Sequence, residues 1–426
     1  MTTPASRPST AQAAGSFLIP LILVTSLFFM WGVANTLNGI LIPQFQKSFS
    51  LTNFQSGLVQ SAFNLGYFLL ALPAARIMKR FGYKTGIIIG LVLYALGALL
   101  FFPAAEIRVY GLFLMALFVI ASGLAFLETA ANPFVTVLGP AETSEKRLNL
   151  SQAFNSLGAI MGIVIGRFFI LSGVEYTPQQ IAAMSADQLQ AFYTAETKAV
   201  QTPYLVLGIV VALWAVFILF SKLPDIKEEA DASSQHQHGF KNLLGHQHFV
   251  AGVVALFLYV GAQVGTWSYL INYAKHTIPG TSELAGADYL TVSLICLMLG
   301  RFSSTFMMKY FRPNRIMALF AAANALLALI AVVMPGIIGL YGLVVSSFFM
   351  SLMFPTIFAL SIKGLGNDTK IGSSILIMAI VGGAVITALM GLISDLSSIT
   401  VAFLLPAVSY LYILWFAIKG FAPKHA

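Results

Sequence analysis

The sequence has little charge, because Asp, Glu, Lys and Arg together make up only 9% of its 426 residues. Soluble domains carry about 25% of these residues, so the composition excludes an ordinary soluble fold. Cysteine is nearly absent: Cys296 is the only one, and it lies within an apolar run. This excludes an intramolecular disulfide framework and a cysteine-based metal site, and packing is the role expected of Cys296.

Apolar runs of 18 or more residues are abundant instead, and hydrophobic residues make up 58% of the chain. Each run can cross roughly 30 Å of hydrocarbon as a helix. We count about twelve between Phe17 and Phe421. The sequence therefore predicts an all-α membrane protein with twelve transmembrane helices in two six-helix bundles. The predicted boundaries are a tail at 1–17, bundles at 18–221 and 248–420, a linker at 222–247 and a tail at 421–426.

The net charge of +8 follows the predicted topology rather than a nucleic-acid surface. Most Lys and Arg fall in the loops on the side of the N-terminus, and only Lys47, Arg108, Lys198 and Lys275 fall in the loops opposite. The positive-inside rule then predicts that both termini are cytoplasmic. The lipid bilayer is the expected partner. The sequence indicates neither nucleic-acid binding nor an obligate protein partner.

The polar linker between the bundles holds an acidic cluster. Four histidines lie within it or directly after it: His236, His238, His246 and His248. A polar loop without cysteine or fixed geometry does not favour a metal site, and no metal or cofactor is expected. In the outer loop after the fifth span, 186–199 is predicted to form a short amphipathic helix. The loops after the second and eighth spans resemble one another at an offset of 230 residues, which is typical of two related halves.

Polar side chains inside membrane helices are costly, so their positions are the best functional signal in the sequence. They recur three or four residues apart, which places them on one face of each helix. The set is Trp31, Asn35 and Asn38 in the first span, Glu128 and Asn132 in the fourth, Gln152 and Asn155 in the fifth, and Gln263 and Trp267 in the seventh. If these faces meet, they enclose a cavity of amides, indoles and one carboxyl group, which suits a neutral sugar or polyol. Each amide or Trp taken alone is also compatible with simple helix packing.

Glu128 differs from the other polar residues because it is the only acid placed deep in the membrane. Burial without a cation favours the protonated form of a carboxyl group, which then exchanges its proton as the access of its cavity to water changes. Glu128 is therefore the predicted proton-coupling residue, with a permanently neutral glutamic acid as the alternative. Arg301, in the eighth span, is predicted to have a structural or gating role, snorkelling or capping a carbonyl.

Several segments resemble the fucose, galactose and glucose branch of the major facilitator superfamily, and the likeness runs over roughly the whole chain. They are WGVANTLNGILIPQF (31–45), LETAANPFVTVLGP (127–140), FNSLGA (154–159), QTPY (201–204), WSYL (267–270), GRF (300–302) and PTIF (355–358). The resemblance implies a twelve-helix facilitator that alternates between outward-open and inward-open states. It also implies import of L-fucose or a related hexose with a proton across the bacterial inner membrane.

The resemblance further implies that Glu128 is one of two protonatable groups, assisted by the amides Gln152 and Asn155 and by Trp31 and Trp267. Two positions depart from the family pattern. Gly39 stands where the branch has an aspartate, and Phe354 stands where it has a tyrosine. The first departure removes one of the two titrating groups, and the second removes a hydroxyl from the cavity wall.

The sequence thus predicts a secondary active sugar transporter with H⁺ as the coupling ion. Na⁺-coupled or uncoupled transport of another sugar is the alternative that Gly39 supports. A non-transporting sugar sensor is less favoured, since no signalling domain is apparent. An enzyme is not expected, because the chain has no His-Glu-x-x-His motif and no serine with a nearby base.

Overall fold

The computed structural model describes residues 10–51, 53–171, 178–224, 240–281 and 283–422, and these residues are helical with short connections. The helices of the first half are α1 (Thr10–Ser48), α2 (Asn53–Ile107), α3 (Tyr110–Val137), α4 (Ser144–Ile165), α5 (Pro178–Ala182), α6 (Ala186–Lys198) and α7 (Gln201–Phe220). Those of the second half are α8 (Phe240–Gly245), α9 (Gln247–Thr277), α10 (Glu283–Met307), α11 (Pro313–Val333), α12 (Ile337–Met350), α13 (Met353–Ile362), α14 (Thr369–Met378), α15 (Gly382–Leu396), α16 (Ile399–Ala402) and α17 (Leu404–Trp415).

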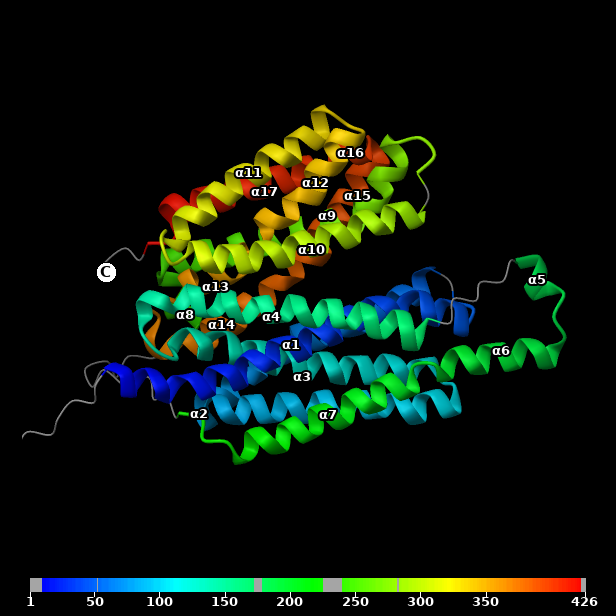
Figure 1. Cartoon of the computed structure of the whole chain (residues 1–426), viewed down its shortest axis with the longest axis horizontal. Helices are drawn as coiled ribbons and strands as arrows, with labels where there is room; N and C mark the ends of the chain where they lie inside the picture. Colours follow the sequence, from blue (N-terminus) through cyan, green and yellow to red (C-terminus); the bar gives the residue numbers. More distant parts are fainter. Residues whose placement is uncertain (1–9, 52, 172–177, 225–239, 282, 423–426) are drawn as a thin grey trace, which may run out of the picture.

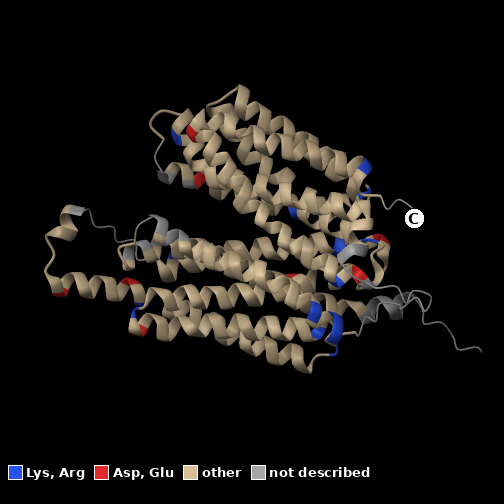
Figure 2. Cartoon of the chain, turned by 180° about the vertical axis from the view of Figure 1, so that it is seen from behind, with Lys and Arg blue, Asp and Glu red and all other residues tan. Residues whose placement is uncertain are grey.

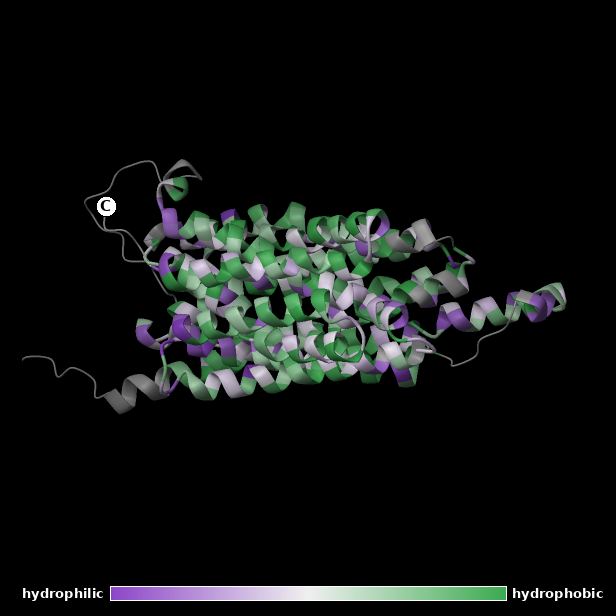
Figure 3. Cartoon of the chain, turned by 90° about the horizontal axis from the view of Figure 1, so that it is seen from above, coloured by the Kyte–Doolittle hydropathy of each residue, from purple (hydrophilic) through white to green (hydrophobic). Residues whose placement is uncertain are grey.

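Eleven helical segments of the described chain are long and apolar enough to cross a membrane, and one of them, Leu58–Ile107, contains two spans. The break lies at Gly82, whose φ of 84° and ψ of 170° are not helical. Glycine adopts this conformation without steric cost because it has no Cβ. Counting α2 as two helices gives the twelve spans predicted from the sequence. Apolar residues dominate the length of the bundle, and hydrophilic residues gather at its two ends (Figure 3).

The tenth and eleventh spans were predicted as single helices but are interrupted. The tenth consists of α12 and α13, which separate at Ser351 and Leu352. Pro355 explains this break, because its ring clashes with the carbonyl four residues earlier and it cannot donate a backbone hydrogen bond. The eleventh consists of α14 and α15, joined by a short turn at Ala379–Val381. The predicted amphipathic helix is present as α6, which begins with a capping box at Ser185.

The two halves use the same close helix crossing. In the first half, a Cβ added at Gly158 of α4 would collide with the carbonyl of Phe29, and one at Gly32 of α1 with the carbonyl of Asn155. In the second half, a Cβ at Gly382 would collide with the carbonyl of Phe257 on α9. The first and fifth spans of each half therefore approach backbone to backbone, as small residues permit in membrane helices.

The halves lie side by side and diverge toward one end (Figure 1). Among the described residues, the main contacts between them are those of α4 with α10 and α13, and of α14 with α2 and α3. We call the end where these contacts occur the closed end, and the end at which α5 and α6 lie the open end. Lys and Arg gather mainly at the closed end (Figure 2), as the positive-inside rule leads one to expect of a cytoplasmic face. The cytoplasmic orientation of the termini and the domain boundaries remain predictions.

Candidate functional site

Glu128 of α3 is buried, with 4% of its surface exposed, and its partner is a phenol. The hydroxyl of Tyr67, from α2, donates a hydrogen bond of 2.8 Å to Oε1 of Glu128. Tyr67 is 8% exposed and also interacts with the side chain of Asn35 on α1. No Lys, Arg or His of the described chain forms an ion pair with Glu128. The carboxyl group is thus held by one neutral donor from α2, the phenol of Tyr67, and that phenol in turn interacts with Asn35 of α1.

The polar face of α1 continues along α2 toward the open end. Asn38 donates to the side chain of Gln60 at 2.9 Å, and Gln60 donates to Asn64 at 3.1 Å. Asn35 and Gly39 are exposed although α1 is a central helix. A Cβ added at Gly39 would meet no atom within 4 Å. The position where the family pattern has an aspartate therefore faces open space.

Three amides connect α4 to its neighbours in the first half. Gln152 donates to Oδ1 of Asn132 on α3 at 3.2 Å, and Asn155 donates to the carbonyl of Phe28 on α1 at 3.2 Å. Trp31 stacks on the ring of Phe28 at 4.4 Å and is 3% exposed. Nδ2 of Asn132 is buried without a hydrogen-bond partner, as is Oδ1 of Asn38. Buried polar groups are usually satisfied, so these two atoms are candidates to bind a hydroxyl.

The predicted residues of the second half are anchored within their own half. Gln263 donates to the hydroxyl of Tyr259 at 2.7 Å, and Nε1 of Trp267 donates to Ser347 on α12 at 3.0 Å. Phe354 is partly buried and packs against Tyr259, with ring centroids 6.5 Å apart. The indole and amide are therefore fixed by hydrogen bonds while part of each side chain stays accessible.

Arg301 of α10 links the two halves, and it is buried rather than snorkelling to the surface. Its guanidinium donates to the backbone carbonyl of Gln152 and, at 2.8 Å, to the hydroxyl of Ser156 on α4. Its Nη1 also lies 3.5 Å from Oδ1 of Asn155. The side chain of Asn149 crosses in the opposite direction and donates to Thr305 at 2.7 Å and to the carbonyl of Arg301 at 3.0 Å. Arg301 thus caps a backbone carbonyl, which is one of the two structural roles expected for it.

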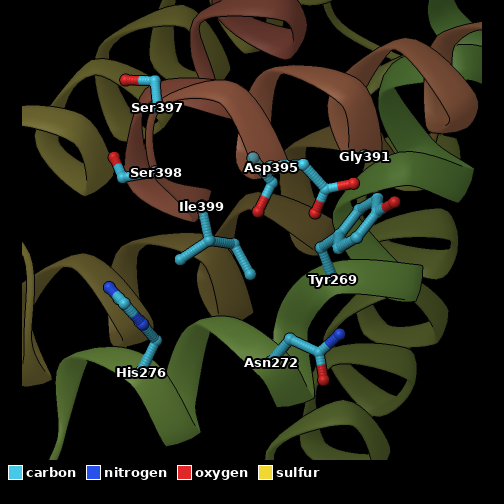
Figure 4. Close-up of a pocket in the computed structure, with 9 residues that line it drawn as sticks. Tyr269, Asn272, His276, Gly391, Asp395, Ser397, Ser398 and Ile399 are labelled. Carbon is cyan, nitrogen blue, oxygen red and sulfur yellow. The ribbon is translucent and has the colours of Figure 1, made fainter.

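A separate polar pocket lies near the loop that joins α15 to α16 (Figure 4). Its volume is about 390 Å³, and it is lined by Tyr269, Asn272, His276, Gly391, Ser394, Asp395, Ser397, Ser398 and Ile399. Trp267 and Gln263 do not line it. We therefore regard it as distinct from the predicted cavity.

The histidines give no sign of a metal site in the part of the chain that is described, where no three His, Cys, Asp or Glu side chains gather. His248 bonds the carbonyl of Lys363 at 2.9 Å, and its ring packs edge-on against His246. His236 and His238 lie outside the described residues.

Sequence reasoning missed the contribution of the second span. Gln60, Asn64 and Tyr67 are spaced four and three residues apart, the same signal that identified the other polar faces. Tyr67 is easily taken for packing, because a phenol is mostly apolar and the sequence does not reveal a distant acid. Asn149 was also missed, since it stands at the predicted end of a span, where polar residues are common. Ser156 was missed because a serine in a helix can bond its own backbone and is no sign of a distant partner.

The predicted residues are one buried carboxyl group with amides and aromatic rings from both halves, and the bonds described above join them within each half. Amides donate to and accept from hydroxyl groups in pairs, and rings pack against the apolar face of a sugar. A carboxyl group without a cation can gain and lose a proton. This is the chemistry that binding of a polyhydroxylated neutral molecule together with one proton requires.

Comparison with known proteins agrees with this chemistry. Residues 23–375 match the profile of the Major Facilitator Superfamily. The chain is 48% identical over 413 residues to the L-fucose-proton symporter of Escherichia coli (strain K12), covering 96% of this chain and 94% of that protein. It is 40% identical over 401 residues to a glucose/galactose transporter of Brucella abortus, covering 94% and 93%.

Among solved structures, the chain resembles the crystal structure of a fucose transporter of this superfamily in the outward conformation. The TM-score is 0.88 at 47% identity, covering 96% of this chain and all of that one.

Proposed function

The chain belongs to the Major Facilitator Superfamily, and we propose that it is a secondary active transporter importing L-fucose or a related hexose together with a proton. It works by alternating access in the bacterial inner membrane. The observation that carries the proposal is the buried carboxyl group of Glu128, which accepts a hydrogen bond from Tyr67 and forms no ion pair with a cation of the described chain. The relatives are named as transporters of fucose, glucose and galactose.

In the proposed cycle, the open end faces the outside and admits sugar and proton. Asn35, Asn38, Asn132, Gln152, Asn155 and Gln263 bond the hydroxyl groups of the sugar, and Trp31 and Trp267 contact its apolar face. Protonation of Glu128 neutralises the site before the closed end separates. Breaking the contacts of Arg301 and Asn149 then exposes the site to the cytoplasm, where sugar and proton leave.

The experiment is uptake of labelled L-fucose, D-galactose and D-glucose by proteoliposomes, with and without an inward-directed proton gradient. The proposal expects at least one sugar to accumulate only when the gradient is present. Flux that is indifferent to pH indicates a uniporter, and accumulation driven by a Na⁺ gradient indicates a Na⁺-coupled transporter. Binding of sugar without flux indicates a sensor. Each of these three results would contradict the proposal.

The substitution Glu128→Gln keeps the shape of the side chain and removes its titration. It should abolish proton-driven accumulation while leaving exchange of labelled for unlabelled sugar, because exchange requires no net proton movement. The matched control is Glu106→Gln, the same substitution at an exposed carboxyl group outside the proposed site, and it should leave proton-driven accumulation in place. Normal accumulation in the Glu128→Gln protein would exclude Glu128 from coupling.

A further inference from the structure

The hydroxyl of Tyr67 makes the one side-chain hydrogen bond recorded for the carboxyl group of Glu128 within the described residues. We infer that Tyr67 is a positioning residue for proton coupling: it donates to Glu128 in both protonation states, so that Glu128 can titrate without the second carboxyl group of the family pattern. This inference rests on the proposed function. It adds a residue that neither the sequence pattern nor the relatives' names assign.

Within the described part of the chain, no other charged side chain bonds to Tyr67 or Glu128, and the buried guanidinium of Arg301 bonds to α4 instead. The phenol of Tyr67 interacts with the side chains of Glu128, Asn35 and Tyr94. The carboxyl group of Glu128 interacts with Tyr67. Asn35 comes from α1, Tyr94 from the second helix of α2, and both are neutral. Tyr94 is itself bonded to the carbonyl of Met30 at 3.0 Å. From α4, the neighbouring polar groups are amides, bonded to Asn132 and Phe28.

A charged carboxylate in a membrane interior is tolerable only if it is hydrogen-bonded. A phenol can donate to it and, unlike an ammonium or guanidinium group, adds no charge that would hold it permanently ionised. The bond between Oη of Tyr67 and Oε1 of Glu128 therefore permits both states. This is the property that a coupling group needs when its usual acidic partner is missing.

The proton balance requires no ionisation of tyrosine. On uptake, a proton from the water of the open end adds to Oε2 of Glu128, while Tyr67 keeps its own proton and still donates to Oε1. On release, the proton leaves Oε2 for the water on the other side and the carboxylate retains the phenol bond. One proton enters and one leaves, and Tyr67 is unchanged.

Access to the pair is provided by the polar face of α2. Gln60, Asn64 and Tyr67 lie four and three residues apart, and Gln60 and Asn64 are exposed. Tyr67 lies about 21 Å from the start of α2 at Asn53, given a rise of 1.5 Å per residue. The open space beside Gly39 adjoins this face through the bond between Asn38 and Gln60. Water from the open end thus has a polar route toward the carboxyl group.

The test is Tyr67→Phe, which removes the hydroxyl and keeps the ring, in proteoliposomes assayed for gradient-driven uptake of L-fucose across a range of external pH. The carboxylate loses its donor, so the pH of half-maximal uptake should rise by about one unit. Sugar exchange at equal pH should stay within about twofold of the unsubstituted protein, which also shows that the variant is folded. The matched control is Tyr94→Phe, which breaks a buried bond of the same kind to a backbone carbonyl and should leave the pH profile in place.

A pH profile of Tyr67→Phe that coincides with that of the unsubstituted protein would overturn the inference, provided that Glu128→Gln abolishes accumulation. In that case the proposed function stands and only the role of Tyr67 is lost. If Tyr67→Phe fails the exchange assay, 3-fluorotyrosine at position 67 replaces it as the probe. As a stronger donor of similar shape it should move the profile to lower pH, and no movement would again overturn the inference.

Discussion

At the scale of single residues, the notable feature is a carboxyl group that shares its buried site with a phenol and amides instead of a cation or a second acid. Glu128 and Tyr67 are 4% and 8% exposed, so their hydrogen bond lies away from bulk water. Hydrogen bonds to charged groups are worth roughly 1.5 to 3 kcal/mol. That magnitude is enough to set the pH at which Glu128 exchanges its proton, but it does not fix the group in one state.

Gly39 gives the first residue-scale prediction. Gly39→Asp places a carboxyl group in open space at no steric cost, since its Cβ would meet no atom within 4 Å. We expect proton-driven sugar accumulation to rise at least about twofold, because a second titrating acid beside the site couples proton binding more strongly to sugar binding. Accumulation ratios in proteoliposomes at fixed pH gradient measure this.

Gly39→Asn is the control for this prediction, since it has nearly the same shape and does not titrate. It should leave the accumulation ratio unchanged. Equal behaviour of the Asp and Asn variants would show that position 39 acts through space or polarity rather than through a proton.

The sequence was sufficient to single out Glu128, because an acid inside an apolar run has no ordinary explanation. It could not reveal Tyr67, because the partner lies 61 positions away and its phenol looks like packing. Nor could it tell that Asn38 is buried against Gln60 whereas Asn35 is exposed. Spacing places both amides near one helix face, but the neighbouring helix decides which one is covered.

At the scale of elements, the crossing of α1 and α4 holds the site in register. Gly32 and Gly158 let the two backbones touch, so the amides of α4 reach the carbonyl of Phe28 and the side chain of Asn132. The apolar runs predicted these helices, because length and hydropathy suffice for a span. The breaks at Ser351 and Ala379 were not predicted, although Pro355 carried a local signal for the first of them.

A pair of substitutions on α1 tests the crossing. Gly32→Ala should lower the melting temperature in detergent by several degrees, since its Cβ would collide with the carbonyl of Asn155 and force α1 and α4 apart. Gly39→Ala, on the same helix, has no atom to collide with and should stay within about a degree. Thermal unfolding of both variants checks this, and similar melting temperatures would contradict the crossing.

At the scale of the whole molecule, the closed end is held by polar contacts between the halves. Asn149 and Arg301 bond across it in both directions, and Lys363 approaches the buried Glu145 at 3.8 Å. Hydrogen bonds between membrane helices average about 0.6 kcal/mol each, up to about 2. Their sum is small enough to be broken once per transport cycle and large enough to set the resting state.

Asn149→Ala should therefore shift the protein away from the conformation open at the α5 and α6 end. Loss of its bonds to α10 should change the ratio of the two states by up to about tenfold. Spin labels on Arg80→Cys and Lys309→Cys, in a Cys296→Ser background, report the distance between the halves at the closed end. That distance should lengthen in the Asn149→Ala protein.

Asn314→Ala is the matched control, because Asn314 donates to the carbonyl of Ala417 within one half. Its distance distribution should match that of the labelled parent protein. A lengthening of equal size in both variants would mean that general destabilisation, not the contact between the halves, is responsible.

The central claim, that Glu128 is the coupling acid and acts without a second one, is tested most directly by the stoichiometry of transport. Proton and sugar fluxes are measured in the same proteoliposomes, and the reversal potential gives protons moved per sugar. One titrating acid predicts a ratio of one for the unsubstituted protein and of zero for Glu128→Gln. A ratio of zero or two in the unsubstituted protein, or an unchanged ratio in Glu128→Gln, would contradict it.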